Sequence, residues 1–111
     1  MAYDEKLAQR IRDLLSGERG VVEKKMFGGL AFLINGNMSV AASGQGGLLV
    51  RVDPDNSDDL LKKPGVESLV MRGRPMAGWL RVDADAVRTK QQLEAWVKRS
   101  VSFARSLPPK R

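Results

Sequence analysis

The 111-residue sequence contains no cysteine and no histidine. The chain therefore cannot form disulfides, Cys/His zinc sites or thiolate nucleophiles. It also lacks the residue that most often serves as general base in a catalytic triad. Any chemistry would depend on carboxylates, lysines, hydroxyl groups or the one tyrosine, Tyr3. The sequence thus predicts no catalytic, cofactor or metal site, and it favours a non-catalytic protein over an enzyme.

Long apolar runs are also missing. None approaches the roughly 20 residues that span a bilayer, and the N-terminal segment MAYDEKLAQR has no apolar signal core. We therefore expect a cytoplasmic protein that does not associate with membranes. The length and the 42% share of apolar residues suit one globular domain with a single core. That domain is expected over residues 1–111, with residues 107–111 as a flexible tail.

Charge is distributed unevenly along the chain, whose formal net charge is +6. Residues 24–52, 68–82 and 95–111 contain bases and no acid. The last group is interpreted as the solvated back of a helix. Basic surfaces attract polyanions, although they also serve solubility. Five bases of the first two segments form a candidate anion-binding or partner-binding surface, with Trp79 as an aromatic neighbour: Lys24, Lys25, Arg51, Arg72 and Arg74.

Helices are expected at three places. Apolar residues recur at helical spacing between residues 7 and 15 and between residues 93 and 104. Asp4, Asp53-Pro54 and the pair Thr89/Gln92 are typical of helix N-termini. These signals predict helices near 4–16, from Pro54 to the Pro64-Gly65 stop, and from Thr89 to about Ser106, with a short helical turn at 83–88.

Strands are expected between these helices. Asn35-Gly36 is the strongest hairpin signal, because both central positions of a type I′ turn need positive φ. The glycine-rich residues 44–47 predict a second reversal. Runs of strands with helices at the ends are typical of an α+β fold, here an antiparallel sheet of about five strands in the order α-β-β-β-β-α-β-α. The strand candidates are residues 21–27, 30–34, 38–42, 48–52, 66–71 and 76–82, with a loop at 72–75 joining the last two.

The Gly28-Gly29 pair follows two lysines and could suggest a phosphate-binding loop. Such a loop needs a helix N-terminus directly after the glycines, whereas here an apolar run of strand length follows. A glycine within a strand usually marks a bulge or a close approach of another backbone. We therefore interpret the pair as a structural feature of the sheet.

Four segments together resemble the N-terminal domain of the TfoX/Sxy proteins. MFGGLAFLINGNMSVAA and LLVRVD are similar to its basic-Met-Phe-Gly-Gly hairpin and to the strand that ends in a basic residue and Asp. MAGWLRVD and LEAWVKRSVSFA are similar to its later strand and closing helix. The resemblance covers roughly residues 4–106. It assigns a structural family motif to Met26, Phe27, Gly28, Gly29, Met76, Gly78 and Trp79.

The resemblance implies helices on an antiparallel sheet and a bacterial regulatory protein, and it supplies no catalytic residue. The best-known members regulate natural competence with a cyclic-AMP receptor protein at promoters, and they carry a second, C-terminal domain. We therefore expect a stand-alone regulatory module that binds another protein. Two alternatives stay open: a weak, sequence-nonspecific nucleic-acid binder acting through the basic surface, and an accessory enzyme domain for anionic substrates. An uncovered sheet edge would also allow a homodimer.

Overall fold

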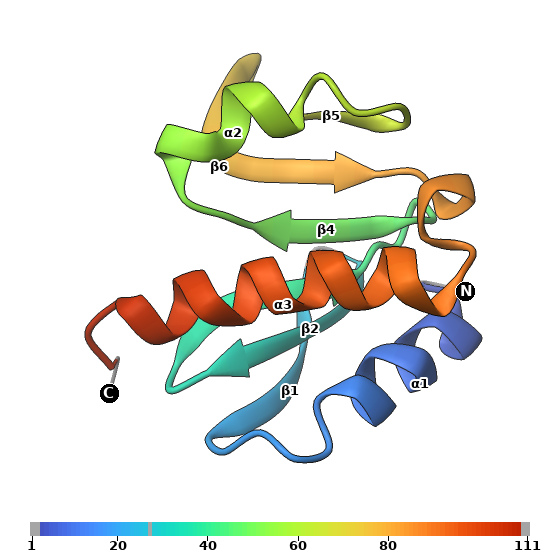
Figure 1. Cartoon of the computed structure of the whole chain (residues 1–111), viewed down its shortest axis with the longest axis vertical. Coiled ribbons are helices and arrows are strands. Elements are labelled where there is room, and N and C mark those ends of the chain that lie inside the picture. Colours follow the sequence, from blue (N-terminus) through green and yellow to red (C-terminus); the bar gives the residue numbers. More distant parts are fainter. Residues whose placement is uncertain (1–2, 27, 110–111) are drawn as a thin grey trace.

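A computed structural model describes residues 3–26 and 28–109 of the chain. The described part is built around one antiparallel sheet of six strands (Figure 1). The strands lie in the order β1-β2-β3-β4-β6-β5, so β1 and β5 form the two edges. The α+β class is confirmed, with six strands in place of about five. Their bounds are β1 (Val21–Met26), β2 (Gly29–Ile34), β3 (Asn37–Ala42), β4 (Leu48–Arg51), β5 (Val66–Met71) and β6 (Arg74–Val82).

The helices lie in front of the sheet in Figure 1, where α3 crosses the middle strands and α1 lies beside it. Strands β4 and β6 pair directly, although α2 and β5 separate them along the chain. The predicted short turn before the last helix is present as η1, a single 3-10 element. The bounds are α1 (Glu5–Leu14), α2 (Pro54–Leu60), η1 (Ala84–Val87) and α3 (Lys90–Ser106).

The N-terminal caps predicted from the sequence are present in all three helices. The carboxylates of Asp4 and Asp53 each accept a backbone N–H bond at 2.9 Å. The Thr89 hydroxyl accepts from the N–H of Gln92 at 3.1 Å, and the Gln92 side chain accepts from the N–H of Thr89 at 3.0 Å. These bonds satisfy donors that have no partner within a helix. They explain why the helices begin where the sequence predicts.

Two hairpins turn through a loop of only two residues, both with positive φ. Asn35 and Gly36 have φ of 52° and 84°, so the predicted turn between β2 and β3 is confirmed. Arg72 and Gly73, between β5 and β6, have φ of 54° and 77°. The longer loop predicted at 72–75 is therefore wrong. Arginine rarely adopts positive φ, so Arg-Gly signals this turn more weakly than Asn-Gly does.

Strand β6 consequently begins at Arg74 and includes Pro75. Prolines are usually excluded from central strands because they cannot donate to the ladder. Strand β4 pairs with β6 only between Trp79 and Val82, so the first half of β6 pairs with β5 alone. At Pro75, β6 pairs with β5 on one side and has no partner strand on the other side within the described chain. A residue without a backbone N–H is therefore tolerated at this position.

The main core lies between the helices and the sheet. The apolar stripes predicted for the first and last helices are buried in it. Full burial of one large apolar side chain stabilises a fold by roughly 1.5–3 kcal/mol. The largest core side chains with less than 2% exposure are Ile11, Phe32, Ile34, Leu48, Leu80 and Leu93.

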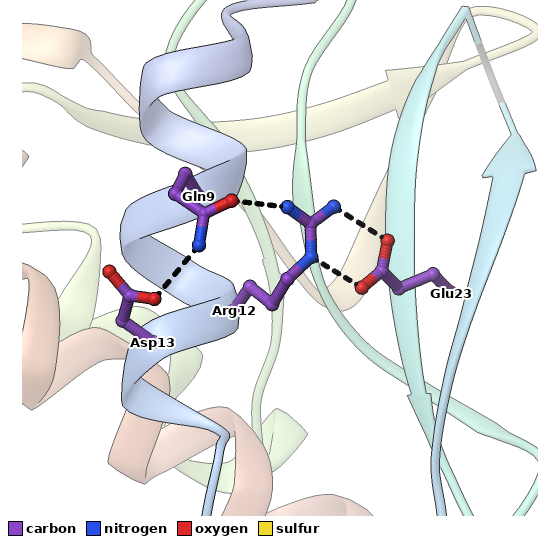
Figure 2. A network of polar contacts seen from close by, with 4 residues as sticks. All are labelled: Gln9, Arg12, Asp13 and Glu23. Carbon is purple, nitrogen blue, oxygen red and sulfur yellow. Dashed lines mark hydrogen bonds and ion pairs between the residues drawn. The ribbon is translucent and has the colours of Figure 1, made fainter.

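Helix α1 is joined to the edge strand β1 by an arginine–carboxylate pair (Figure 2). Arg12 donates two hydrogen bonds to the carboxylate of Glu23, at 2.6 and 2.7 Å. A third bond runs from Arg12 to Gln9 at 2.6 Å. The bond from Arg12 lowers the pKa of Glu23 below its ordinary value of 4.5. Both side chains are more than a third exposed, so the pair mainly orients α1 on β1.

The chain after α3 is attached to the sheet as far as it is described. The carbonyl of Pro108 accepts a hydrogen bond at 2.9 Å from the buried side-chain amide of Asn37, at the start of β3. Arg105 in the last turn of α3 pairs with Glu18 at 2.7 Å. Residues 110 and 111 of the predicted tail lie outside the described part.

Candidate interaction surface

A second apolar cluster lies on the face of the sheet that points away from α1 and α3. Side chains alternate along a strand, and these residues alternate with core residues such as Phe32, Val40 and Val50. Among the described residues, every member of the cluster comes from a strand. We call this surface the helix-free face. Its buried members are Ala31, Met38, Ala41 and Leu49, with half-buried Met26, Leu33, Leu69 and Trp79 packed against them.

Cross-strand pairing shows how far the helix-free face extends. Residues directly opposite each other on neighbouring strands share a face. One such row starts at Lys24 in β1, crosses Ala31, Ala41 and Leu49, and reaches Arg81 in β6. The two alanines present only methyl groups, and the middle of the row is buried, with Ala31, Ala41 and Leu49 at 0%, 3% and 5% exposure. The row ends at Glu67 in the edge strand β5, opposite Arg81. The face is therefore apolar in its centre, basic at the β1 end, and carries an arginine and a glutamate at the β5 end.

A second row on this face contains Val22, Leu33 and Met38. Val22 is 58% exposed and lies in the edge strand β1. Leu33 is half-buried, and Met38 belongs to the buried centre. This row carries the apolar surface from the middle of the sheet to solvent at its edge.

Arg51 is the best-positioned base of the helix-free face. It pairs across strands with Trp79, and its guanidinium carbon lies 5.2 Å from the centroid of that ring. The same carbon lies 5.6 Å from the ring centroid of Phe103 in α3. Contact with two aromatic rings restrains the guanidinium. Because Phe103 belongs to α3, the guanidinium of Arg51 lies where the helix-free face meets the helix side of the sheet.

The charges of the face are unbalanced. Its paired strands present three bases, Lys24, Arg51 and Arg81, and one acid, Glu67. Arg81 lies 4.0 Å from Glu67, which partly neutralises it. Within the described chain, Lys24 and Arg51 have no ion-pair partner. The excess of positive charge on the face comes from these two residues.

The five bases predicted from the sequence as one surface are only partly brought together. Lys24 and Arg51 share the helix-free face. Lys25 pairs with the core residue Leu30, so it lies on the helix side of β1. Arg72 and Arg74 are exposed at the tip of the β5–β6 hairpin, on the opposite edge of the sheet.

The two lysines also have a structural role at the sheet edge. Lysines in an edge strand oppose pairing with another chain, because their charge would be placed against the incoming strand. The other edge strand, β5, has a register irregularity between Ser68 and Val70. Both edges therefore carry features that disfavour edge-to-edge association of two copies.

The Gly28-Gly29 pair belongs to a tight reversal and not to a ligand loop. Met26 pairs with Gly29, and Gly28 between them has a φ of 74°. A Cβ on Gly29 would lie 2.1 Å from the carbonyl oxygen of Ala42. The expected close backbone approach is thus confirmed for Gly29. A bulge at this point is wrong, since the pair lies where β1 ends and β2 begins. The motif residue Phe27 lies outside the described residues.

The later part of the family motif shapes strand β6. Gly78 has a φ of 80°, and its carbonyl accepts a hydrogen bond from the N–H of Val52 at 2.7 Å. A Cβ at Gly78 would lie 2.8 Å from the carbonyl oxygen of Val52. Met76 precedes it in the exposed half of the strand, and Trp79 follows it onto the helix-free face. Gly78 therefore lets β6 approach the end of β4 closely enough for Trp79 to meet Arg51.

The helix side has a groove that sequence reasoning missed. A pocket of about 480 Å³ lies between residues 63–66, η1 and α3, and one of about 440 Å³ lies between α2 and α3. Arg99 lines both. Its guanidinium carbon lies 4.8 Å from the ring centroid of Trp96. Arg99 was expected on a solvated helix back. The contact between Trp96 and Arg99 could have been predicted from their spacing, because residues three apart in the sequence are neighbours on a helix surface. The rim carries the acids Asp53, Asp59, Asp83 and Asp85.

The described residues contain no group of three or more acidic side chains arranged to hold a metal ion. None of their helices combines the length and apolar character needed to cross a membrane.

Comparison with known proteins places the chain in a family. No significant match was found among curated proteins or among solved structures. A model of the TfoX N-terminal domain matches residues 13–104. The match includes all six described strands, together with α2 and most of α3. The chain therefore belongs to the TfoX N-terminal domain family.

Proposed function

We propose that this chain is a non-catalytic regulatory module that binds another protein through the helix-free face. Membership of the TfoX N-terminal domain family supports a regulatory role. The observation that carries the proposal is the second apolar cluster, to which no helix of the described chain contributes. An apolar sheet face is normally covered by another layer of structure. The buried members of this cluster are 0–6% exposed, so the proposed contact region is the solvent-facing edge of the face at Val22, which is 58% exposed.

The alternative of nucleic-acid binding has weaker support. A binder of single strands combines a continuous basic groove with aromatic side chains that stack bases. Here the candidate bases divide between two faces and two edges of the sheet, and the centre of the helix-free face is aliphatic. These features suit a protein partner better than a polyanion.

The chain offers a matched pair of variants to test the proposal. Val22 and Val70 are 58% and 57% exposed, and they lie in the two opposite edge strands. Only Val22 lies in the row that joins Leu33 and Met38. We expect Val22→Glu to weaken partner binding, because it places a buried carboxylate in the interface. Val70→Glu adds the same charge away from the face and should leave binding unchanged.

The measurement is quantitative affinity capture from cytosolic extract with the wild type and both variants at equal concentration. Proteins retained by the wild type and by Val70→Glu but released by Val22→Glu are ligands of the face. Each is then purified and titrated by calorimetry. The proposal fails if every retained protein binds the two variants equally.

A further inference from the structure

We propose that the larger pocket of the helix side binds short apolar peptides with free termini, which carry one ammonium and one carboxylate group. We call this hollow between residues 63–66, η1 and α3 the Trp96 pocket. It lies on the core side of the sheet, opposite the helix-free face, so the inference goes beyond the proposed function and does not depend on it. Its volume of about 480 Å³ is within the range of roughly 300–1,000 Å³ that small-molecule sites occupy.

The floor of the Trp96 pocket is apolar. Trp96 itself is 4% exposed, and half-buried Val66 and Ala86 line the pocket with it. Gly65 has a φ of 78°, and a Cβ on it would lie 3.0 Å from the Cβ of Ala86, so any side chain at this position would crowd the wall. An apolar lining of this kind suits the body of a ligand, while a few polar groups fix its orientation.

One wall carries a carboxylate that is free to accept an ammonium group. Asp83 directly precedes η1, where an aspartate often accepts a backbone N–H bond, yet its side chain makes no capping bond. It is exposed, and it forms no ion pair within the described chain. The other acid of the pocket, Asp85, is already bound by Arg88 at 2.6 Å. Asp83 is therefore the acceptor that the pocket offers.

The α3 wall carries a base that is prepared for a carboxylate. The guanidinium carbon of Arg99 lies 4.8 Å from the ring centroid of Trp96, which restrains it. Restraint reduces the entropy lost when an ion pair forms, and the N–H donors of arginine match the two oxygens of a carboxylate. Arg99 is half-buried and has no ion-pair partner in the part of the chain that the structure describes. Lys63 adds a second base to the same pocket.

The two free charges select for a ligand that carries both signs. Asp83 and Arg99 line the same pocket from different elements and do not pair with each other. A ligand with only one charge would cover the opposite group of the pocket without pairing it, which costs free energy. A short peptide with free termini supplies a partner for each group and an apolar body for the floor.

The inference is tested with leucyl-leucine, its methyl ester and its N-acetyl form. The ester keeps only the ammonium group, and the acetyl form keeps only the carboxylate. Nuclear magnetic resonance titration of isotope-labelled protein gives each dissociation constant at neutral pH and low salt. We expect leucyl-leucine to bind about fivefold more tightly than either derivative, as one exposed charge pair allows. Physiological salt should reduce the difference.

Two variants should each remove one of these preferences. Asp83→Asn should abolish the advantage of leucyl-leucine over the N-acetyl form, because the ammonium group loses its partner. The double variant Lys63→Gln/Arg99→Gln should abolish the advantage over the methyl ester, because the carboxylate loses its partners. Circular dichroism melts establish that each variant is folded.

Matched controls change the same charges outside the Trp96 pocket. Asp58→Asn removes one exposed carboxylate from α2. Lys62→Gln/Lys98→Gln removes the neighbours of the two pocket bases, and neither lysine lines the pocket. Both controls should keep the affinities of the wild type for all three ligands.

The outcomes separate this inference from the proposed function. If the three ligands bind the wild type equally, or if none binds at millimolar concentration, the inference is overturned. If the N-acetyl form binds as tightly as leucyl-leucine and only the double variant releases both, the pocket recognises an anion and the dipolar ligand is refuted. The variant Val22→Glu should bind leucyl-leucine like the wild type, so loss of partner binding at the helix-free face leaves this result unchanged.

Discussion

Replacing each glycine of the Gly28-Gly29 pair by alanine should destabilise the protein for two different reasons. A Cβ at Gly29 would lie 2.1 Å from the carbonyl oxygen of Ala42, whereas real Cβ atoms essentially never approach closer than 3.0 Å. The backbones of β2 and β3 must therefore separate by at least about 0.9 Å, the difference between the two values. At Gly28 no atom lies within 4 Å of the added Cβ, but φ is 74°. There the cost is conformational only.

The expected loss in the free energy of unfolding follows from these two geometries. Forcing an atom into a filled space costs about 1–3 kcal/mol, and weakening a backbone hydrogen bond of the ladder adds about 1 kcal/mol. Gly29→Ala should therefore lower the free energy of unfolding by about 3 kcal/mol. A left-handed alanine costs about 1–2 kcal/mol, so Gly28→Ala should have the smaller effect. Gly28→Asn should cost less still, since asparagine adopts positive φ more readily.

The assay is urea unfolding followed by far-UV circular dichroism. A chain of this length is expected to have a stability of about 5–15 kcal/mol, so a loss of 3 kcal/mol would shift the midpoint clearly. The order of destabilisation should be Gly29→Ala, then Gly28→Ala, then Gly28→Asn. The structural reasoning is refuted if Gly29→Ala unfolds at the midpoint of the wild type, or if Gly28→Ala costs more than Gly29→Ala.

Three further predictions concern stability. Thr89→Ala removes one half of the capping box with Gln92 and should cost about 1 kcal/mol in urea unfolding; an unchanged midpoint would contradict the role of the cap. Phe32→Ala empties a fully buried site and should cost about 3–5 kcal/mol, whereas Val70→Ala at an exposed site should stay within about 0.5 kcal/mol. The folded-state pKa of Glu23 is lowered by the bond from Arg12, so the carboxylate stabilises the fold above about pH 4.5 and loses this effect as the pH falls through the lowered pKa. Glu23→Gln should therefore lower the melting temperature at pH 7 and match the wild type at the acid end of a pH series; an equal deficit at both ends would contradict the assignment.

Features set by neighbouring residues were predictable from the sequence. The caps at Asp4, Asp53 and Thr89 depend on donors two or three residues away, and the Asn35-Gly36 turn depends on two backbone conformations. The apolar spacing of the first and last helices likewise identified the side that is buried. Each of these signals depends on residues that lie close together in the sequence. They were sufficient for the α+β class and for most element bounds.

The candidate surface was less predictable. Arg51 and Trp79 are far apart in the sequence and become neighbours only because β4 pairs with β6 past the inserted β5. Basic residues that are clustered in the sequence can equally be separated by folding. Arg72 and Arg74 lie at the opposite edge from Lys24, although all three belong to segments without acids.

The sequence by itself determined the helices, the Asn35-Gly36 turn, the excess of positive charge and the likeness to the TfoX N-terminal domain family, because each depends on residue type and local spacing. Only the tertiary structure decided which bases share a surface. A shift of one residue in strand register moves a side chain to the other face, so Lys24 and Lys25 could be assigned to their faces only once β1 was paired with β2. The same pairing brought Gly29 against Ala42 and showed that the glycine pair serves the sheet.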